Sequence, residues 1–306
     1  FSDLCSVMDF CSPQKAVWVD QSEVKKLHIP VKRNNGVVEI RIENLALDHI
    51  QPEKIQYHYP LFFIHGAGGT SQSWKNYLPY FAANGWEVYA LNLRGHFPSD
   101  HEEALAQVTI ENYLEDMLKV IRHLQIQHCV LIGHSLGGLL AQKMAENMTK
   151  VKALITMASA PPFGIVPDVH QNLPYFGVML ETMWTMINLE PIKPTFPLAE
   201  KTALSNIEPD KQKTVFNMFV PESLMVGYQV SQGYPIYAQK IACRKLVIGC
   251  AKDVIAPPSM QRRLADLLGA DYLEYEQFGH LPMLEKGWMQ SSEDIRNWLK
   301  KNVKDE

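Results

Sequence analysis

The sequence lacks the features that mark membrane, fibrous and nucleic-acid-binding proteins. No stretch reaches the run of about 18 uninterrupted apolar residues that a membrane helix needs, so we expect no transmembrane segment. The 17 glycines and 19 prolines form no repeat, which excludes fibrous and low-complexity chains. Lys and Arg form no sustained run and the net charge is −4, so we expect no nucleic-acid partner. What remains is a globular chain of 306 residues with room for one or two cores.

Cysteine is also scarce, with five residues and no C-x-x-C pair. Cys5 and Cys11 are able to bridge in an oxidising compartment. Three other cysteines lie in or beside apolar runs typical of buried strands: Cys129, Cys243 and Cys250. We therefore expect free thiols and a cytoplasmic location, while a secretory signal ahead of the first residue stays open. No group of His, Cys, Asp and Glu has metal-ligand spacing, so we expect no metal and no other cofactor.

Apolar runs and helical periods alternate along most of the chain. Residues 1–23 show no clear period and are expected to form an arm, and residues 24–31 and 37–45 predict a β-hairpin around Asn34, Asn35 and Gly36. Further strands are expected at 61–64, 87–91, 129–132, 153–157, 245–249 and 272–275. Helices are expected at 74–83, 110–124, 136–147, 259–268 and 291–302, the second capped by Thr109. This rhythm predicts a parallel sheet built from βαβ units.

The rhythm stops between residues 159 and 244, where helical periods and prolines occur without a convincing buried strand. We interpret this stretch as a helical cap inserted over the end of the sheet. The catalytic core would then consist of residues 1–158 and 245–306, and the cap of residues 159–244.

The sequence GHSLG at residues 133–137 follows a predicted strand and opens a predicted helix. A serine on so sharp a turn projects its hydroxyl away from the sheet, and the flanking glycines avoid a clash with the neighbouring backbone. This context predicts that Ser135 is a nucleophile. The competing interpretation is an ordinary glycine-rich helix start.

A serine hydroxyl needs a base, and the base needs a carboxylate that fixes its tautomer. His280 follows the last predicted strand and is our candidate base, with His96 as its competitor. Asp253 follows the strand at 245–249 and is the candidate acid; the alternatives are a solvated surface role for Asp253, and Asp168 as the acid instead. We thus predict a triad of Ser135, Asp253 and His280 at one sheet edge.

The sequence HGAGG at residues 65–69 also follows a strand. Its glycines let the backbone approach a reacting carbon, so we predict an oxyanion hole from the backbone N–H groups of Ala67 and Leu136, with Gly68 as the second choice to Ala67. A plain turn is the alternative, and His65 is expected to organise its own loop.

Ser135, Asp253 and His280, in this chain order on a βαβ scaffold with His65 and Gly66 upstream, resemble the α/β-hydrolase fold superfamily. The resemblance covers about residues 40–301 and is to a serine esterase or lipase-like member with a helical cap. It implies an α/β fold with an eight-stranded, mostly parallel sheet, helices on both faces and a cap after the sixth strand. One departure is Phe97, where relatives commonly have the second glycine of an R-G-H-G-x-S pattern.

Apolar residues of the predicted cap follow helical spacing and either pack on the core or line a substrate channel. The candidate pocket residues are Trp74, His134, Phe163, Met179, Met183, Trp184, Met218 and Leu281. The cap has no cluster of Lys or Arg that would hold an anion, since its lysines read as a solvated rim. The predicted activity is hydrolysis of a neutral, moderately hydrophobic small-molecule ester through an acyl-enzyme.

Other activities of the same superfamily stay open. Carbon–carbon bond hydrolases, thioesterases, acyltransferases and hydroxynitrile lyases share the serine, and a ligand-binding receptor is the non-enzymatic alternative. Haloalkane dehalogenases and epoxide hydrolases are disfavoured, because those relatives carry aspartate at the position of Ser135. The sequence leaves the oligomeric state open.

Overall fold

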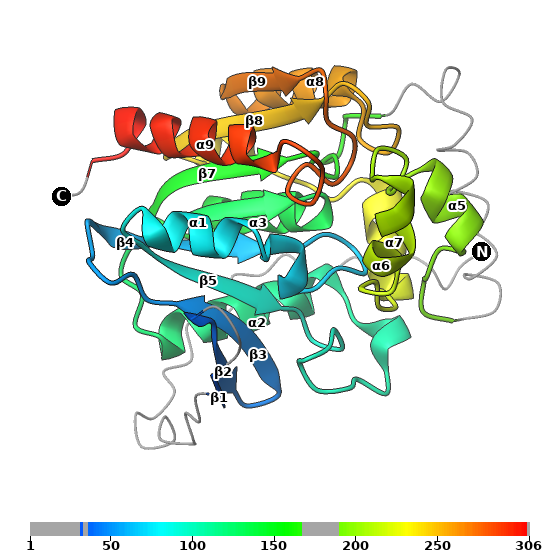
Figure 1. The fold of residues 1–306 in the computed structure, drawn as a ribbon, viewed down its shortest axis with the longest axis horizontal. Coiled ribbons are helices and arrows are strands. Elements are labelled where there is room, and N and C mark those ends of the chain that lie inside the picture. The colour runs from blue at the N-terminus through cyan, green and yellow to red at the C-terminus, as the bar shows by residue number, and fades with distance from the viewer. Residues whose placement is uncertain (1–30, 33–35, 167–189, 305–306) are drawn as a thin grey trace, which may run out of the picture.

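The computed structural model describes residues 31–32, 36–166 and 190–304 of the chain (Figure 1). A single twisted sheet has the strand order β1-β2-β3-β5-β4-β6-β7-β8-β9. Its strands are β1 (Val31–Lys32), β2 (Val38–Ile42), β3 (Leu45–Ile50), β4 (Tyr57–Ile64), β5 (Trp86–Asn92), β6 (Cys129–His134), β7 (Val151–Met157), β8 (Arg244–Cys250) and β9 (Asp271–Tyr275). β4 to β9 run parallel, and β1 to β3 are antiparallel. The predicted eight-stranded, mostly parallel sheet is thus confirmed as β2–β9, and the two-residue β1 extends its edge.

The described end of the predicted hairpin is confirmed, because Val31 pairs with Glu39 and Lys32 with Val38 in antiparallel register, while residues 1–30 lie outside the described residues. The second strand of the hairpin is shorter than predicted. Residues 37–45 do not form one strand, because the chain turns at Glu43, whose φ of 53° is left-handed, and at Asn44. β2 and β3 then pair with each other, Ile42 opposite Leu45. β1 retains a short pairing with β2 on the other side. The alternating pattern of residues 37–50 continues through the turn, which is why a single longer strand was expected.

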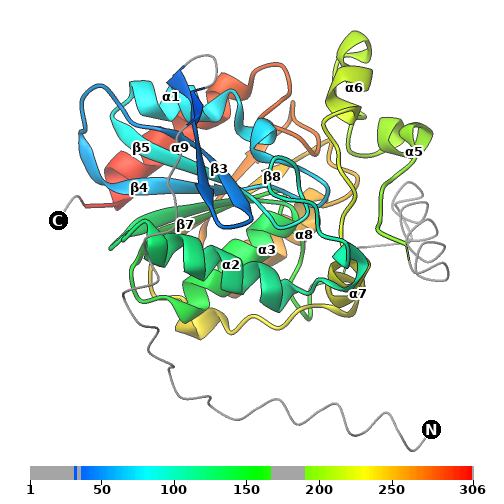
Figure 2. The ribbon, with the colours of Figure 1, turned by 90° about the horizontal axis from the view of Figure 1, so that it is seen from below.

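Helices cover both faces of the sheet, as expected (Figure 2). One face carries α1 (Tyr77–Ala83) and α9 (Trp288–Asn302), and the other carries α2 (Ile110–His123), α3 (Leu136–Asn147) and α8 (Pro258–Leu268). Side chains alternate across β4, so that Phe62 packs into the core under α2 and α3 while Phe63 packs into the core under α1 and α9. Thr109 caps α2 through the N–H of Asn112.

The segment between β7 and β8 holds α5 (Phe196–Lys201), α6 (Pro209–Phe216) and α7 (Leu224–Gln232), followed by a 3-10 turn at Ala238–Lys240. These helices lie beyond the ends of the strands toward which the arrows of β7 and β8 point (Figure 1). We call residues 159–244 the inserted segment. Its described part forms no strand beyond the isolated bridges Pro162–Tyr234 and Ile192–Glu222.

Cys129 and Cys250 are buried in strands, Cys243 is partly buried, and all three are free thiols. Cys5 and Cys11 lie outside the described residues. No helix within the described ranges is both long and apolar enough to cross a membrane.

Candidate active site

Ser135 sits between β6 and α3 on a strained turn. Its φ of 51° and ψ of −120° fall where side-chain-bearing residues are rarely found. The backbone is fixed there because the Ser135 N–H donates to the carbonyl of Met157 at 3.1 Å, and its own carbonyl accepts from Ala160 N–H at 2.9 Å. A Cβ on Gly137 would lie 2.3 Å from the carbonyl oxygen of Ile64, so only glycine permits this approach of α3 to β4. The sharp turn predicted at residues 133–137, which we call the elbow, is therefore present.

Asp253 and His280 are joined by a hydrogen bond. Asp253 lies in the loop after β8, and its Oδ2 accepts from His280 Nδ1 at 2.8 Å. Its Oδ1 accepts from the N–H groups of Ile255 at 2.8 Å and Ala256 at 2.9 Å. Burial alone would raise the pKa of Asp253, but the charge of His280 and these hydrogen bonds hold it below the ordinary value of 3.8. The carboxylate is thus held ionised and fixes the Nδ1–H tautomer of His280.

The loop that carries His280 is clamped by Glu285. The Glu285 carboxylate accepts from the N–H groups on both sides of His280, Gly279 at 2.7 Å and Leu281 at 3.0 Å. Asn206, from the inserted segment, donates through Nδ2 to Glu285 Oε2 at 2.5 Å and to the carbonyl of Gln277 at 2.8 Å. The position of His280 therefore depends on a buried acid and on the inserted segment.

Two further histidines are neutral and structural. His65 Nδ1–H donates to the carbonyl of Gly66 at 2.8 Å while its Nε2 accepts from Leu93 N–H at 3.1 Å, and burial lowers its pKa to about 3. It organises its own loop, as expected. Burial also lowers the pKa of His134 to about 3. The Nε2–H group of His134 donates to the carbonyl of His280 at 2.7 Å. Its ring lies beside that of His280, with centroids 4.9 Å apart, which places His280 next to the elbow.

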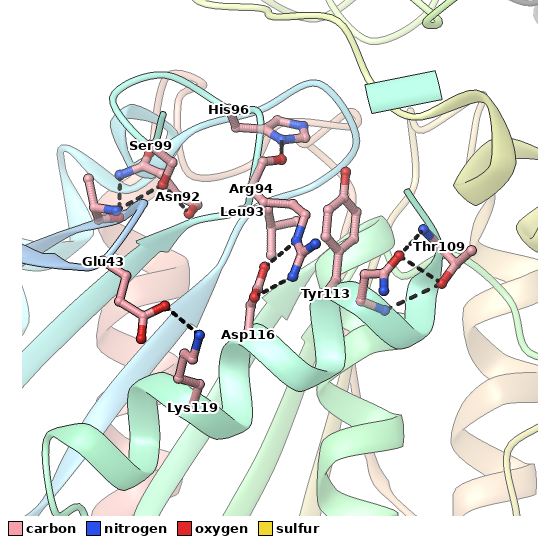
Figure 3. A network of polar contacts seen from close by, with 12 residues as sticks. Glu43, Asn92, Leu93, Arg94, His96, Ser99, Thr109, Tyr113, Asp116 and Lys119 are labelled. Carbon is pink, nitrogen blue, oxygen red and sulfur yellow. Dashed lines mark hydrogen bonds and ion pairs between the residues drawn. The ribbon is translucent and has the colours of Figure 1, made fainter. Parts of the chain in front are cut away.

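His96, the competing base, has a different environment. Its Nδ1 lies 3.0 Å from the carbonyl of Arg94 and its Nε2 lies 3.2 Å from Glu222 Oε2, so both ring nitrogens face acceptors. A ring that donates from both nitrogens is the imidazolium. Burial lowers the pKa of His96, but the charge of Glu222 and the hydrogen bonds to Glu222 and to the Arg94 carbonyl together outweigh it and raise the pKa above 6.5. The loop that carries His96 is held on α2 by the bidentate pair of Arg94 and Asp116, both bonds 2.7 Å (Figure 3).

Glu222 is the functional candidate that sequence reasoning missed. It is 3% exposed in the inserted segment, directly before α7. Only the lysines of this segment were expected to form a solvated rim, and no role was predicted for Glu222. Its partners Gly68, His96 and Tyr113 are each separated from it by more than a hundred positions, so no local signal in the sequence marks it.

The loop at residues 65–69, which we call the oxyanion loop because it is predicted to supply a donor to an oxyanion, reaches the same site. Gly68 N–H donates to Glu222 Oε2 at 3.2 Å, so this second-choice donor is already engaged. The N–H groups of Ala67 and Leu136 have no hydrogen-bond acceptor within the described part of the chain. Ala67 is exposed and Leu136 opens α3, where N–H groups point out of the helix.

The described candidate pocket residues differ in burial, and His134 among them is 3% exposed. Trp74 is fully buried against Phe63, and Leu281 is 5% exposed within the same core. Phe163 is 71% exposed, and Met218 is partly buried after α6. Their role as pocket residues stays a prediction. Met179, Met183, Trp184 and the alternative acid Asp168 lie outside the described residues.

Phe97 is 74% exposed, so the loop after β5 accommodates it by turning the ring to solvent. Among the described residues, no group of three or more His, Cys, Asp or Glu side chains is arranged to hold a metal ion.

The sheet order and the helices on both faces define a protein of the α/β class. Residues 59–287 match the family described as alpha/beta hydrolase fold, and the chain belongs to this family.

Named relatives include enzymes that act on esters. The Strigolactone esterase D14 of Arabidopsis thaliana is 30% identical over 236 residues, which are 73% of this chain and 86% of that protein. Protein ABHD8 of Bos taurus is 28% identical over 232 residues, 74% of this chain and 52% of that protein, so the chain spans about half of this relative. The esterase EaEST from Exiguobacterium antarcticum superimposes with a TM-score of 0.67 over 90% of this chain and all of that one, at 18% identity. This last likeness shows the fold alone.

Proposed function

We propose that the protein is a serine hydrolase that cleaves carboxylic esters of neutral, moderately hydrophobic small molecules. The observation that carries the proposal is the hydrogen-bonded pair of Asp253 and His280, held beside the strained elbow of Ser135. The kinship to a protein named an esterase supports the same chemistry.

The reaction divides into two halves. His280 Nε2 takes the proton of the Ser135 hydroxyl, whose oxygen bonds to the ester carbonyl carbon. The N–H groups of Ala67 and Leu136 stabilise the negative oxygen of the tetrahedral intermediate. The imidazolium of His280, stabilised by Asp253, then protonates the leaving alcohol as the carbon–oxygen bond breaks. Water attacks the acyl-enzyme in the same way and releases the acid and Ser135.

The inserted segment is proposed to act as the cap over this site. It contacts the histidine loop through Asn206 and the oxyanion loop through Glu222. The core would comprise residues 1–158 and 245–306.

The test is a series of nitrophenyl esters from acetyl to long-chain acyl, with Ser135→Ala as the inactive variant. Ser231→Ala, which changes an exposed serine of α7, is the matched control. We expect multiple turnover in the wild type and in Ser231→Ala, and loss of turnover with a preserved circular dichroism spectrum in Ser135→Ala. Full activity of Ser135→Ala would refute the proposal.

The same experiment separates the alternatives. A fluorophosphonate should label Ser135 in the wild type, and labelling without turnover of any ester would favour a ligand-binding receptor. Product that partitions to an added alcohol or thiol would indicate acyl transfer. Turnover of a dienol diketone, with simple esters untouched, would indicate a carbon–carbon hydrolase.

A further inference from the structure

Glu222 is surrounded by four hydrogen-bond donors in a buried position. Its Oε1 accepts from the Tyr113 hydroxyl at 2.6 Å and from Ser223 N–H at 2.7 Å. Its Oε2 accepts from Gly68 N–H and His96 Nε2, both at 3.2 Å. Tyr113 rises from α2 toward the loop of His96 (Figure 3), and the two rings lie 6.0 Å apart. The carboxylate thus joins the inserted segment, α2, the loop after β5 and the oxyanion loop.

The inserted segment holds both backbone polar groups of Gly68. The N–H of Gly68 donates to Glu222, and its carbonyl accepts from Val220 N–H at 2.9 Å. With a φ of +62°, Gly68 brings its α-carbon so close to the inserted segment that a Cβ there would lie 2.8 Å from the Val220 carbonyl oxygen. The Ala67 N–H shares its peptide group with the Gly66 carbonyl, which accepts from His65 Nδ1 at 2.8 Å and from Gly69 N–H at 2.9 Å. Gly68 lies inside this turn, so its anchoring to the inserted segment fixes the other side of Ala67 and contributes to the direction of the Ala67 N–H.

Charge balance makes the anchor specific for a carboxylate. His96 places both ring nitrogens against acceptors, so it is a cation opposite the Glu222 anion. Burial alone would raise the pKa of Glu222, but the charge of His96 and the donated hydrogen bonds lower it to about 2. Loss of the carboxylate would leave a buried imidazolium and the N–H of Gly68 without an acceptor.

We propose that Glu222 is a positioning residue of the oxyanion hole: it fixes Gly68 and thereby the direction of the Ala67 N–H. This inference rests on the proposed ester hydrolysis at Ser135. Glu222 does not touch the reacting atoms, and its effect passes through the Gly68 peptide. The inserted segment therefore contributes to the rate of the reaction as well as covering the sheet end.

A second anchor of the inserted segment supplies the matched control. Glu111, at the start of α2, accepts from Gln229 Nε2 at 2.8 Å and from the Tyr234 hydroxyl at 2.7 Å. It ties the inserted segment to the core as Glu222 does, but it contacts neither residues 65–69 nor His96. Glu111→Gln therefore loosens the segment without reaching the oxyanion loop.

The experiment compares Glu222→Gln and Glu111→Gln with the wild type on one nitrophenyl ester. Active sites are counted by fluorophosphonate labelling taken to completion, so that kcat refers to folded, reactive sites alone. An oxyanion donor acts in the transition state, and a displacement of about 1 Å costs about a hundredfold, so we expect kcat of Glu222→Gln to fall about 10- to 100-fold. KM should change less than about threefold, and Glu111→Gln should retain the wild-type kcat.

Each other result has a defined meaning. An unchanged kcat per labelled site in Glu222→Gln, whatever its melting temperature, would show a purely structural role and overturn the inference. An equal fall of kcat in both variants would overturn it as well, because general loosening of the segment would then be the cause. Should Glu222→Gln fail to fold, Tyr113→Phe removes one of the four donors; a kcat lowered at constant KM supports the inference, and an unaltered kcat overturns it.

Failure of the proposed function shows separately. If the wild-type chain neither reacts with the fluorophosphonate nor turns over any ester, the hydrolase assignment fails and this inference with it. If the wild type is active and only the Glu222 result is negative, the assignment stands without the inference.

Discussion

Replacement of Gly137 by alanine tests whether the contact between β4 and α3 sets the position of Ser135. A Cβ at residue 137 would lie 2.3 Å from the carbonyl oxygen of Ile64 and 2.5 Å from that of His65. Ordinary contacts begin at 3.4 Å, so the start of α3 must withdraw from β4 by about 1 Å. Both obstructing atoms are backbone carbonyl oxygens, one from the last residue of the central strand β4 and one from the residue after it, and they cannot turn aside as a side chain would.

The withdrawal moves Ser135 and the N–H of Leu136 together, away from Ala67. A displacement of about 1 Å costs about a hundredfold in rate, and overpacking costs about 1–3 kcal/mol of unfolding free energy. The measurements are kcat per fluorophosphonate-titrated site and urea unfolding. Gly227→Ala is the control, because a Cβ there meets only the flexible end of the Ile192 side chain. A kcat within about threefold of wild type, together with unchanged stability, would refute the account of the elbow.

Two further predictions concern the buried ionisable residues Glu285 and His96. Glu285→Ala should lower kcat about tenfold and the unfolding free energy by about 1–3 kcal/mol, because two buried N–H groups beside His280 lose their acceptor. The exposed Glu276→Ala in the same loop should alter neither quantity, and equal behaviour of the two variants would contradict the clamp. His96 has a folded pKa above 6.5, so its contribution to stability is complete below pH 6.5 and is lost as pH rises through the raised value. When the pH is raised from about 6 to about 9, the unfolding free energy of His96→Asn, measured by urea titration, should therefore fall less than that of the wild type. Parallel pH profiles of the two proteins would disprove the ion pair of His96 with Glu222.

The helices and parallel strands were predictable because their signals are local. α3 runs from Leu136 to Asn147, as its pattern predicts, and Thr109 caps α2 as expected. The turn at Glu43 was not predictable, since a glutamate with a left-handed φ interrupts an alternation that continues on both sides. There the pairing of β2 with β3 outweighs the local preference of the residue.

Part of the candidate site was likewise predictable from the sequence, and part was not. The three predicted triad residues each follow a strand, and the topology of a parallel sheet brings the ends of these strands to one edge. The positions of Ser135, Asp253 and His280 after predicted strands were therefore enough to select them from the sequence. Glu222 follows no strand, and its acceptor role depends on donors at positions 68, 96 and 113 that only the folded chain assembles. The opposite charge states of His65 and His96 likewise depend on whether the second ring nitrogen meets a donor or an acceptor.

The inserted segment forms hydrogen bonds to both loops of the candidate site. Asn206 binds the loop that carries His280, and Val220 and Glu222 bind the oxyanion loop. The segment is therefore not a modular lid that can be exchanged between relatives to transplant specificity. A chimera with the inserted segment of another protein would have a new pocket, but the two loops of the candidate site would lack their hydrogen bonds to Asn206, Val220 and Glu222. Grafts that retain Asn206 and residues 220–222, and vary only the helices between and around them, are the ones expected to keep the rate while altering the choice of substrate.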